Sequence, residues 1–194
     1  MTVTQNGSTS VENVYVQSDN QADITISNFD DVEVQTRGEG PSTITVNDAV
    51  TGMVDTGEGD DIINLDLTNI SSFTINGDGG FDTVAIDGAL VLGDGTLSLG
   101  DIEALDITGT GDSDLTITYE DVLGATDEGD ILHIYGNDGD VVNLLDLDDI
   151  GTGEWVPGED NGVGTEYHYQ VGGAIEATVI IDNAIAEVHI DNIP

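Results

Sequence analysis

The chain has 194 residues, of which 40 are Asp or Glu. Arg37 is its single Lys or Arg residue, so the formal net charge at neutral pH is −39. This charge excludes nucleic acids and anionic membrane surfaces as natural partners, because binding them needs clusters of Lys and Arg. The chain is nevertheless 38% hydrophobic, unlike a disordered acidic tail. Internal ion pairs cannot offset 40 acids with one base. We therefore expect an external counter-charge, with a metal ion as the natural candidate.

Ten short triplets, each with one middle residue between two apolar residues, recur through the first part of the chain. Each triplet is typical of a minimal β-strand whose flanking side chains face inward and whose middle side chain faces outward. Gly, Asn, Asp and Ser fill the gaps, which are predicted to be turns. In chain order the predicted strands are 14–16, 24–26, 32–34, 44–46, 63–65, 73–75, 84–86, 97–99, 105–107 and 115–117.

Alternate triplets fall about 20 residues apart, the length of one coil of a repeat protein. Their middle residues form two series, which are Thr25, Thr45, Asn64 and Ala85, and Tyr15, Glu33, Val54 and Thr74. Two short strands per coil predict an all-β fold, a parallel β-solenoid or β-roll. The register loosens after Ile86, where the segment 90–92 and the triplet 97–99 crowd together.

The remainder of the chain, 119–194, has a different pattern. One helical turn is predicted at 119–123, and an irregular loop at 146–164 contains the only Trp. The predicted strands are longer and lie at 131–135, 141–145, 166–170, 177–181 and 186–190. We therefore divide the chain into a solenoid region, 1–118, and a β-rich antiparallel cap, 119–194. The end of a solenoid needs such a cap because an uncovered coil exposes apolar surface and strand edges.

Two stretches, 56–65 and 77–86, run from a Gly-rich turn through an Asp into an apolar–x–apolar strand. This order is close to the nonapeptide of calcium-binding β-rolls. Glycines allow a tight turn that aims backbone carbonyls inward, and the Asp adds a carboxylate. Ca²⁺ takes six to eight such hard oxygens at about 2.3–2.6 Å. The predicted metal-binding residues are Gly57, Gly59, Asp61, Gly77, Asp78, Gly79 and Asp82.

Asp61 and Asp82 are separated by one coil, so we expect them to stack in register. The pattern is degenerate elsewhere, because the position equivalent to Asp61 is Ala22, Ser42 or Ser113 in other coils. Few sites are therefore expected. A further candidate is the turn containing Asp138 and Asp140. An EF-hand starting at Asp146 fits poorly, because its twelfth position would be a proline. The alternative is that each turn is an ordinary Asp/Gly turn on an acidic surface.

The segments after Ile102 resemble a known family. They read IEALDITGTGDSDLTITYEDVL, then DILHIYGNDGDVVNL, a Trp, and TEYHYQ ahead of ATVIIDNAI. They are similar to a module near the C-terminus of the very large, biofilm-forming RTX adhesins that bacteria export by type I secretion. The similarity covers roughly residues 56–190. Two features depart from the family, namely the acidic insertion LDLDDIGTG before Trp155 and the small number of nonapeptides.

The resemblance implies an extracellular or cell-surface protein that is exported without an N-terminal signal peptide and folds on calcium, its cofactor. Neighbouring adhesin domains are the implied partners. The charge supports the same logic independently. At the low calcium concentration inside a cell, carboxylate repulsion is expected to keep the chain unfolded. Outside the cell, millimolar calcium would neutralise the turns and couple folding to binding.

No motif supports catalysis, and the chain is predicted not to be an enzyme. His133, His168 and His189 each lie in the middle of a predicted strand and are expected at its surface. The glycine-rich turns lack the Lys and the following helix of a phosphate-binding loop.

The alternative function is adhesion through a bound ligand. A glycan or peptide site near Trp155, Tyr167 and Tyr169 is one form of it, although Trp155 is more simply a core anchor beneath the acidic loop. Ice binding by the small outward column that contains Thr25 and Thr45 is less favoured, because the column is short and mixed.

Overall fold

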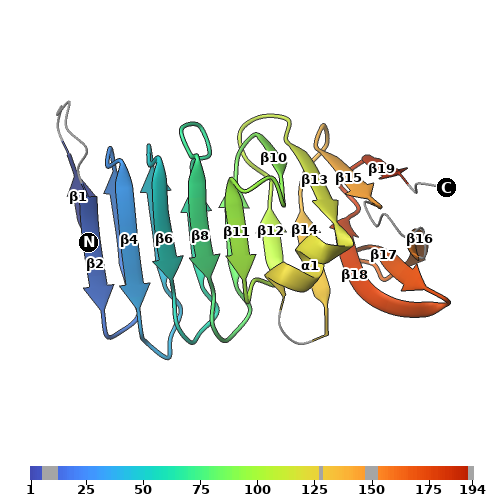
Figure 1. The fold of residues 1–194 in the computed structure, drawn as a ribbon, viewed down its shortest axis with the longest axis horizontal. Helices are drawn as coiled ribbons and strands as arrows, with labels where there is room; N and C mark the ends of the chain where they lie inside the picture. Colours follow the sequence, from blue (N-terminus) through green and yellow to red (C-terminus); the bar gives the residue numbers. More distant parts are fainter. Residues whose placement is uncertain (6–12, 127–128, 147–152, 192–194) are drawn as a thin grey trace.

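A computed structural model describes residues 1–5, 13–126, 129–146 and 153–191 (Figure 1). Short strands stack side by side along one axis into a parallel β-solenoid, and an antiparallel sheet lies at the C-terminal end. The predicted all-β solenoid fold is confirmed. No helix within the described residues is long and apolar enough to cross a membrane.

Three sheets make up the molecule. The ten-stranded sheet has the order β1 (Thr2–Thr4), β3 (Asp23–Ser27), β5 (Thr43–Asn47), β7 (Ile62–Leu65), β9 (Thr83–Ile86), β12 (Ala104–Asp106), β14 (Ile131–Tyr135), β18 (Ala174–Asp182), β17 (Gly164–Val171) and β16 (Gly153–Asp160). The five-stranded sheet has the order β11 (Leu97–Gly100), β8 (Ser72–Asn76), β6 (Thr51–Asp55), β4 (Asp31–Thr36) and β2 (Asn13–Ser18). The third sheet has the order β10 (Ala89–Val91), β13 (Asp114–Thr118), β15 (Val141–Leu145) and β19 (Glu187–Asp191).

In-register stacking explains why the triplets repeat. Ile44 pairs with Ile24 on one side and with Ile63 on the other, and the side chains of all three are buried between the sheets. Each added coil therefore extends one continuous apolar core. Burial of this core stabilises a solenoid whose individual strands are short.

One outward column is confirmed and the other needs a correction. Thr25, Thr45, Asn64 and Ala85 are paired in the register that the sequence predicts. In the second column, however, Glu33 pairs with Met53 and not with Val54. Val54 is fully buried. Gly52 occupies the inward position at which the other coils place an apolar residue, so the triplet pattern was misaligned by one residue at this coil.

The crowding after Ile86 marks the start of the third sheet. β10 does not continue the five-stranded sheet but pairs in parallel with β13, which pairs in turn with β15. The predicted helical turn forms the helix α1 (Tyr119–Ala125). Its N-cap is Thr118, whose hydroxyl accepts the backbone N–H of Asp121 while the carboxylate of Asp121 accepts the N–H of Thr118. This capping box fixes the start of the helix.

Parallel coils continue beyond residue 118. β14 pairs in parallel with β12, and β19 with β15. Antiparallel pairing is confined to β16, β17 and β18. The part of the predicted loop between Gly153 and Asp160 is a strand, contrary to the sequence prediction, because it completes this antiparallel sheet. Residues 147–152 of that loop lie outside the described residues.

Buried aromatic rings join the cap to the last coils. Trp155 is 1% exposed and its Nε1 donates to the carbonyl of Leu145 at 3.1 Å. The ring of Tyr169 stacks on Tyr119 with centroids 4.1 Å apart, and its hydroxyl donates to Asp146 at 3.0 Å. Trp155 is therefore a core anchor, as the simpler of the two interpretations predicted.

We expect Tyr169→Phe to lower the free energy of unfolding by about 1–3 kcal/mol, because the buried carboxylate of Asp146 loses a hydrogen bond while the ring stays in place. Tyr167→Phe is the matched control, since Tyr167 is only half-buried. Urea denaturation of both variants tests this, and equal stability of the two would show that the hydroxyl of Tyr169 contributes nothing.

Candidate metal site in the stacked aspartate turns

The two Gly-rich turns lie directly on top of each other. Glu58 and Gly79 form a parallel bridge between them, and the N–H of Gly59 donates to the carbonyl of Gly79 at 2.6 Å. Gly57 and Asp78 occupy equivalent positions and both have a positive φ, 76° and 60°. The predicted one-coil stacking of the two motifs is thus present.

Asp61 and Asp82 form a ladder inside the solenoid. Both residues are 0% exposed. The Oδ1 atom of Asp82 accepts the backbone N–H of Asp61 at 2.8 Å, and the Oδ1 atom of Asp61 accepts the backbone N–H of Ser42. Each side chain thereby satisfies a buried donor of the coil before it, which is a structural role of its own.

The ladder runs past the two aspartates in both directions. The hydroxyl of Ser42 accepts the N–H of Ala22 at 3.3 Å, and Glu103 Oε2 accepts the N–H of Asp82 at 2.7 Å. Sequence reasoning interpreted Ser42 as a lost metal position and did not consider Glu103. Ser42 and Glu103 could have been found from their spacing. Each lies about one coil from a neighbouring aspartate of the ladder and close to the start of a strand.

One carboxylate oxygen of each aspartate is not used by the ladder. Asp61 Oδ2 and Asp82 Oδ2 are buried and have no hydrogen-bond partner among the described residues. Ser42 accepts the N–H of the preceding coil with its single side-chain oxygen. An Asp at this position therefore has a second oxygen that this hydrogen bond does not need. A buried carboxylate oxygen without a partner is unfavourable, and either a proton or a cation would relieve it.

The surplus oxygen of Asp82 shares its surroundings with another acceptor. A Cβ built on Gly77 would collide with both Asp82 Oδ2 and the backbone carbonyl of Asp101. Two oxygens therefore border the same small volume above Gly77, and neither an ionised carboxylate nor a carbonyl can donate a hydrogen bond. This is the polarity that a bound cation requires.

Burial is the main electrostatic influence on the ladder. It raises the pKa of Asp82 to about 7, and the neighbouring charges of Asp61 and Glu103 act in the same direction. Burial also raises the pKa of Asp61, partly offset by the hydrogen bond from the N–H of Ser42. Loss of hydration disfavours the charged form of both carboxyls.

Asp78, the third predicted side-chain ligand of the two stacked turns, faces the outside of its turn. It is exposed and its Oδ1 accepts from the Asn76 amide at 2.5 Å. The carboxyl of Asp55 lies beside it, and burial together with the charge of Asp78 raises the pKa of Asp55. The structure therefore brings Asp61 and Asp82 together inside the coil and leaves Asp78 apart from them.

These residues match calcium in the type of donor atom. Within the described residues, no three His, Asp or Glu side chains converge on a common metal position. Asp82 Oδ2 and the backbone carbonyl of Asp101 border one volume, and Asp61 Oδ2 belongs to the neighbouring coil. All three are the hard oxygens that Ca²⁺ prefers. A cation held here would take most of its ligands from the backbone.

The second candidate turn is already satisfied by hydrogen bonds. Asp140 is 1% exposed, with Oδ1 accepting the N–H of Ser113 at 2.8 Å and Oδ2 accepting the N–H of Asn137 at 2.7 Å. Asp138 is exposed. Since neither oxygen of Asp140 is left over, this turn has the structural ladder without the feature that points to a metal, and we propose no ion here.

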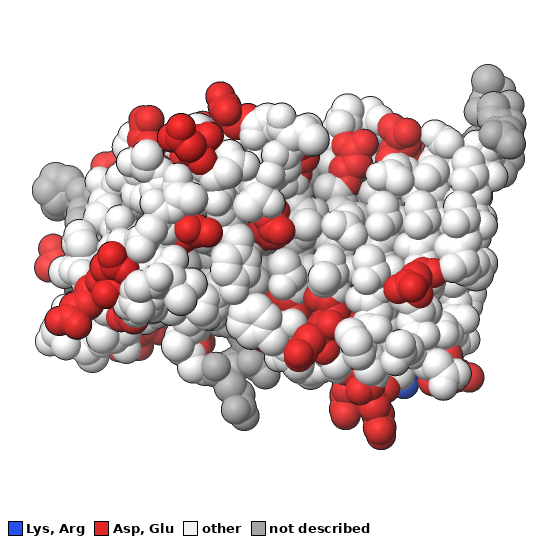
Figure 2. Space-filling view, turned by 180° about the vertical axis from the view of Figure 1, so that it is seen from behind, with Lys and Arg blue, Asp and Glu red and all other residues white. Residues whose placement is uncertain are grey.

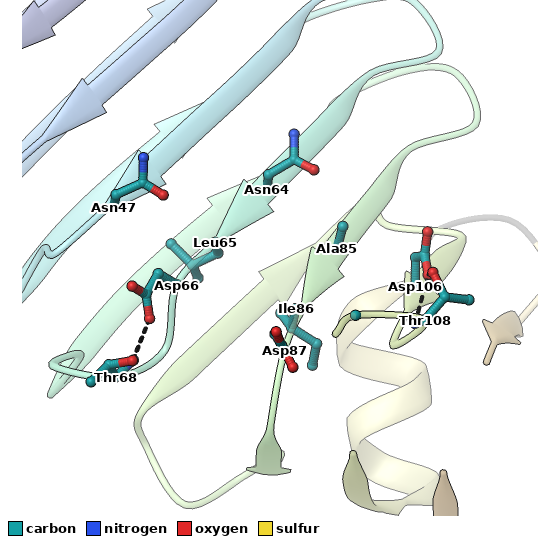
Figure 3. A pocket seen from close by; sticks show the side chains of 11 residues that line it. Asn47, Asn64, Leu65, Asp66, Thr68, Ala85, Ile86, Asp87, Asp106 and Thr108 are labelled. Carbon is teal, nitrogen blue, oxygen red and sulfur yellow. Dashed lines mark hydrogen bonds between the residues drawn. The ribbon is translucent and has the colours of Figure 1, made fainter. Parts of the chain in front are cut away.

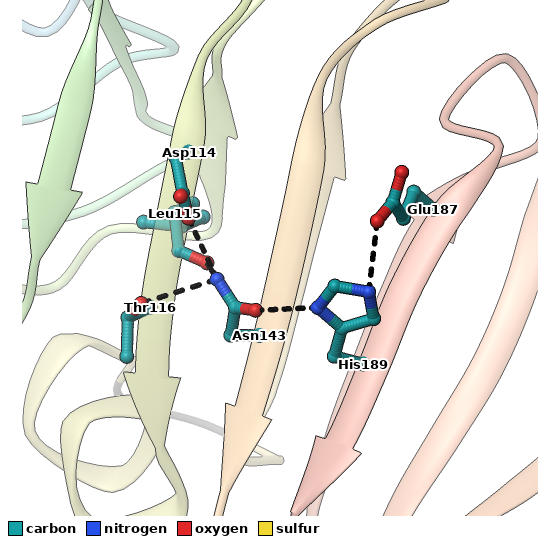
Figure 4. A network of polar contacts seen from close by, with 6 residues as sticks. All are labelled: Asp114, Leu115, Thr116, Asn143, Glu187 and His189. Carbon is teal, nitrogen blue, oxygen red and sulfur yellow. Dashed lines mark hydrogen bonds and ion pairs between the residues drawn. The ribbon is translucent and has the colours of Figure 1, made fainter.

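The three histidines lie in strands, as predicted, and take part in surface contacts. His189 Nδ1 lies 2.9 Å from Asn143 Oδ1, and its Nε2 lies 2.9 Å from Glu187 (Figure 4). Asn143 in turn donates to Asp114 at 2.6 Å. This network ties the edge strand β19 to β15 and β13. His133 and His168 are half-buried.

A trough of about 600 Å³ lies at the ends of β7, β9 and β12 (Figure 3). Asp66 and Asp106 border it, and each accepts the N–H of the threonine two residues later at 2.9 Å. These hydrogen bonds lower the pKa of Asp66. Such side chains shape turns, and their carboxylates are occupied in doing so.

Figure 2 shows acidic side chains at the borders of this face and also within it, and the single blue side chain, Arg37, stands at one border beside acidic ones. With a formal charge of −39, the folded chain has a repulsive, solvated surface.

Comparison with models of protein families, with curated proteins and with solved structures finds no match to this chain.

Proposed function

We propose that this chain is a non-enzymatic, calcium-binding structural module of a secreted or cell-surface RTX adhesin. The observation that carries the calcium part is the pair of buried oxygens, Asp61 Oδ2 and Asp82 Oδ2, which the hydrogen-bond ladder does not use. The net charge supports the same conclusion, because few cationic groups oppose it. The adhesin class and the export by type I secretion are proposed from the resemblance of the segments after Ile102.

The architecture supports the structural part of the proposal. The stacked coils form a rod with a continuous core, and such a rod is suited to a structural role. Calcium between two coils would add its binding free energy to folding. The ligand-binding alternative loses support at the cap, since Trp155 and Tyr169 are buried in the core.

Thermal unfolding at pH 8, followed by circular dichroism in calcium, magnesium or EDTA, tests the proposal. We expect the highest melting temperature in calcium, with a gain of about 3 kcal/mol at a hundredfold excess over the dissociation constant. Asp82→Asn should abolish the difference between calcium and EDTA. Asp19→Asn removes the same charge from an exposed site and should preserve it. Identical melting of the unmodified chain in calcium and EDTA would refute the proposal.

A further inference from the structure

Two Asn–Gly dipeptides lie among the described residues. Asn76 and Gly77 stand at the end of β8, whereas Asn161 and Gly162 stand at the tip of the hairpin that joins β16 to β17. In such a dipeptide the backbone nitrogen of the glycine can attack the side-chain amide carbon of the asparagine, because glycine has no side chain to obstruct the approach. The surroundings of each dipeptide decide whether this reaction within the chain is open to it.

At the hairpin tip, a carboxylate holds the attacking nitrogen. The N–H of Gly162 donates to Asp160 Oδ1 at 2.7 Å, and the Asn183 amide donates to the same oxygen at 3.1 Å. These hydrogen bonds lower the pKa of Asp160, so its carboxylate is charged at neutral pH and can accept the proton of that N–H. Apart from its chain neighbours, no described atom lies within 4 Å of where a Cβ on Gly162 would stand.

The side-chain carbonyl of Asn161 faces two hydrogen-bond donors. Its Oδ1 atom accepts the N–H of Val163 at 3.0 Å and the N–H of Gly164 at 3.1 Å. Attack on the amide carbon moves negative charge onto this oxygen, and two N–H groups already in place stabilise that charge as an oxyanion hole does. The amide nitrogen donates to Glu166 Oε1 at 3.4 Å in an exposed position, from which ammonia can leave to solvent.

We propose that Asn161 is a self-modification site, at which the asparagine converts to aspartate and isoaspartate. A bond forms between the Gly162 nitrogen and the Cγ atom of Asn161, and the proton of the N–H passes to Asp160 and on to the departing nitrogen. The bond between Cγ and Nδ2 breaks and releases ammonia. Solvent water then opens the cyclic imide at either carbonyl. The chain gains a negative charge, and the isoaspartyl product has an additional methylene in the backbone of the turn.

The packing of the solenoid closes the same reaction at Asn76. The N–H of Gly77 donates to the carbonyl of Gly100 at 3.0 Å and thereby joins two coils, and the Asn76 amide donates to Asp78 Oδ1 at 2.5 Å. A Cβ on Gly77 would collide with the carbonyl of Asp101, so this backbone has no room to turn. Asn76 is therefore an internal reference with the same dipeptide and a blocked geometry.

Incubation of the full chain at pH 8 in heavy-oxygen water, followed by peptide mapping with mass spectrometry, is the experiment. Opening of the imide incorporates oxygen from water, so the label marks each asparagine that has reacted. In the folded chain we expect Asn161 to react at least about tenfold faster than Asn76, because only Asn161 can reach the geometry of attack. In urea the two rates should become similar, since only the dipeptides remain.

Two variants separate a built site from a merely exposed dipeptide. Asp160→Asn keeps an oxygen that accepts the N–H of Gly162 but removes the charged base, and it should slow the labelling of Asn161 severalfold. Asp19→Asn removes the same charge from an exposed residue of another turn and should leave the rate unchanged. Circular dichroism verifies that both variants are folded during the incubation.

Three results would overturn the proposal. The first is a folded chain in which Asn161 carries no label. The second is equal labelling of Asn161 and Asn76 in the folded chain, which would show that the fold does not select between them. The third is undiminished labelling of Asn161 in folded Asp160→Asn, which would leave only the exposure of the dipeptide.

Discussion

In calcium-free buffer, the free energy of unfolding should fall as the pH rises through about 7. Asp82 has a pKa near 7 in the folded chain and an ordinary value near 3.8 when unfolded. Between these values the folded state binds more protons than the unfolded state, so stability decreases with increasing pH. The contribution is complete below the unfolded value and is lost as the pH passes the folded value. It amounts to at most about 4 kcal/mol.

The pH window separates this effect from general charge repulsion. Ordinary carboxyls titrate near pH 4, so by pH 6 the rest of the acidic surface is already charged. Urea denaturation between pH 6 and pH 8 in EDTA therefore excludes the ordinary carboxyls. The three histidines titrate in the same window in every variant, so the comparison with Asp82→Asn isolates Asp82. We expect a clear decline for the unmodified chain and for Asp19→Asn, and a much flatter profile for Asp82→Asn. A decline in Asp82→Asn as steep as in the unmodified chain would place the titrating group elsewhere.

Gly77→Ala should be among the most damaging single substitutions in the solenoid. The added Cβ would collide with the carbonyl of Asp101, which is backbone and cannot rotate away, and with the carboxylate of Asp82. We expect a loss of about 3 kcal/mol or more in the free energy of unfolding, since both coils must shift to make room.

Gly79→Ala in the same turn is the matched control. The nearest atom to a Cβ at Gly79 is Glu58 Cγ at 3.8 Å, an ordinary contact. Its effect should stay below about 1 kcal/mol. Chemical denaturation of the two variants compares them directly, and similar stabilities would mean that the space above Gly77 is not as closed as the structure shows.

The solenoid could be predicted from the sequence because its signal is repeated. Most coils place apolar residues at the same two inward positions, so the repeat is clear even where a single triplet is ambiguous. The prediction failed where this repetition is interrupted. Because Gly52 has no apolar side chain at its inward position, the sequence pattern placed Val54, and not Met53, in the outward column. The strand of β16 was missed because its partner is an antiparallel neighbour, and a turn-rich segment with Pro157 and Gly158 has no such repeat.

The stacking of Asp61 and Asp82 was predictable for the same reason, since residues one coil apart must stack in a regular solenoid. The direction of each side chain was not. Asp61 and Asp78 were both predicted as ligands, yet the carboxylate of Asp61 is buried within the ladder and that of Asp78 is exposed. That difference depends on the conformation of the turn and on which N–H groups of the preceding coil need an acceptor. Neither can be predicted from the spacing of residues in the sequence.

The most direct test of the calcium proposal is the amount of calcium bound at pH 8, measured by equilibrium dialysis. We expect the unmodified chain and Asp19→Asn to bind the same number of ions, and Asp61→Asn and Asp82→Asn, while folded, to bind fewer. Binding that is equal in all four proteins, or absent from the unmodified chain, would contradict a calcium site between these two coils.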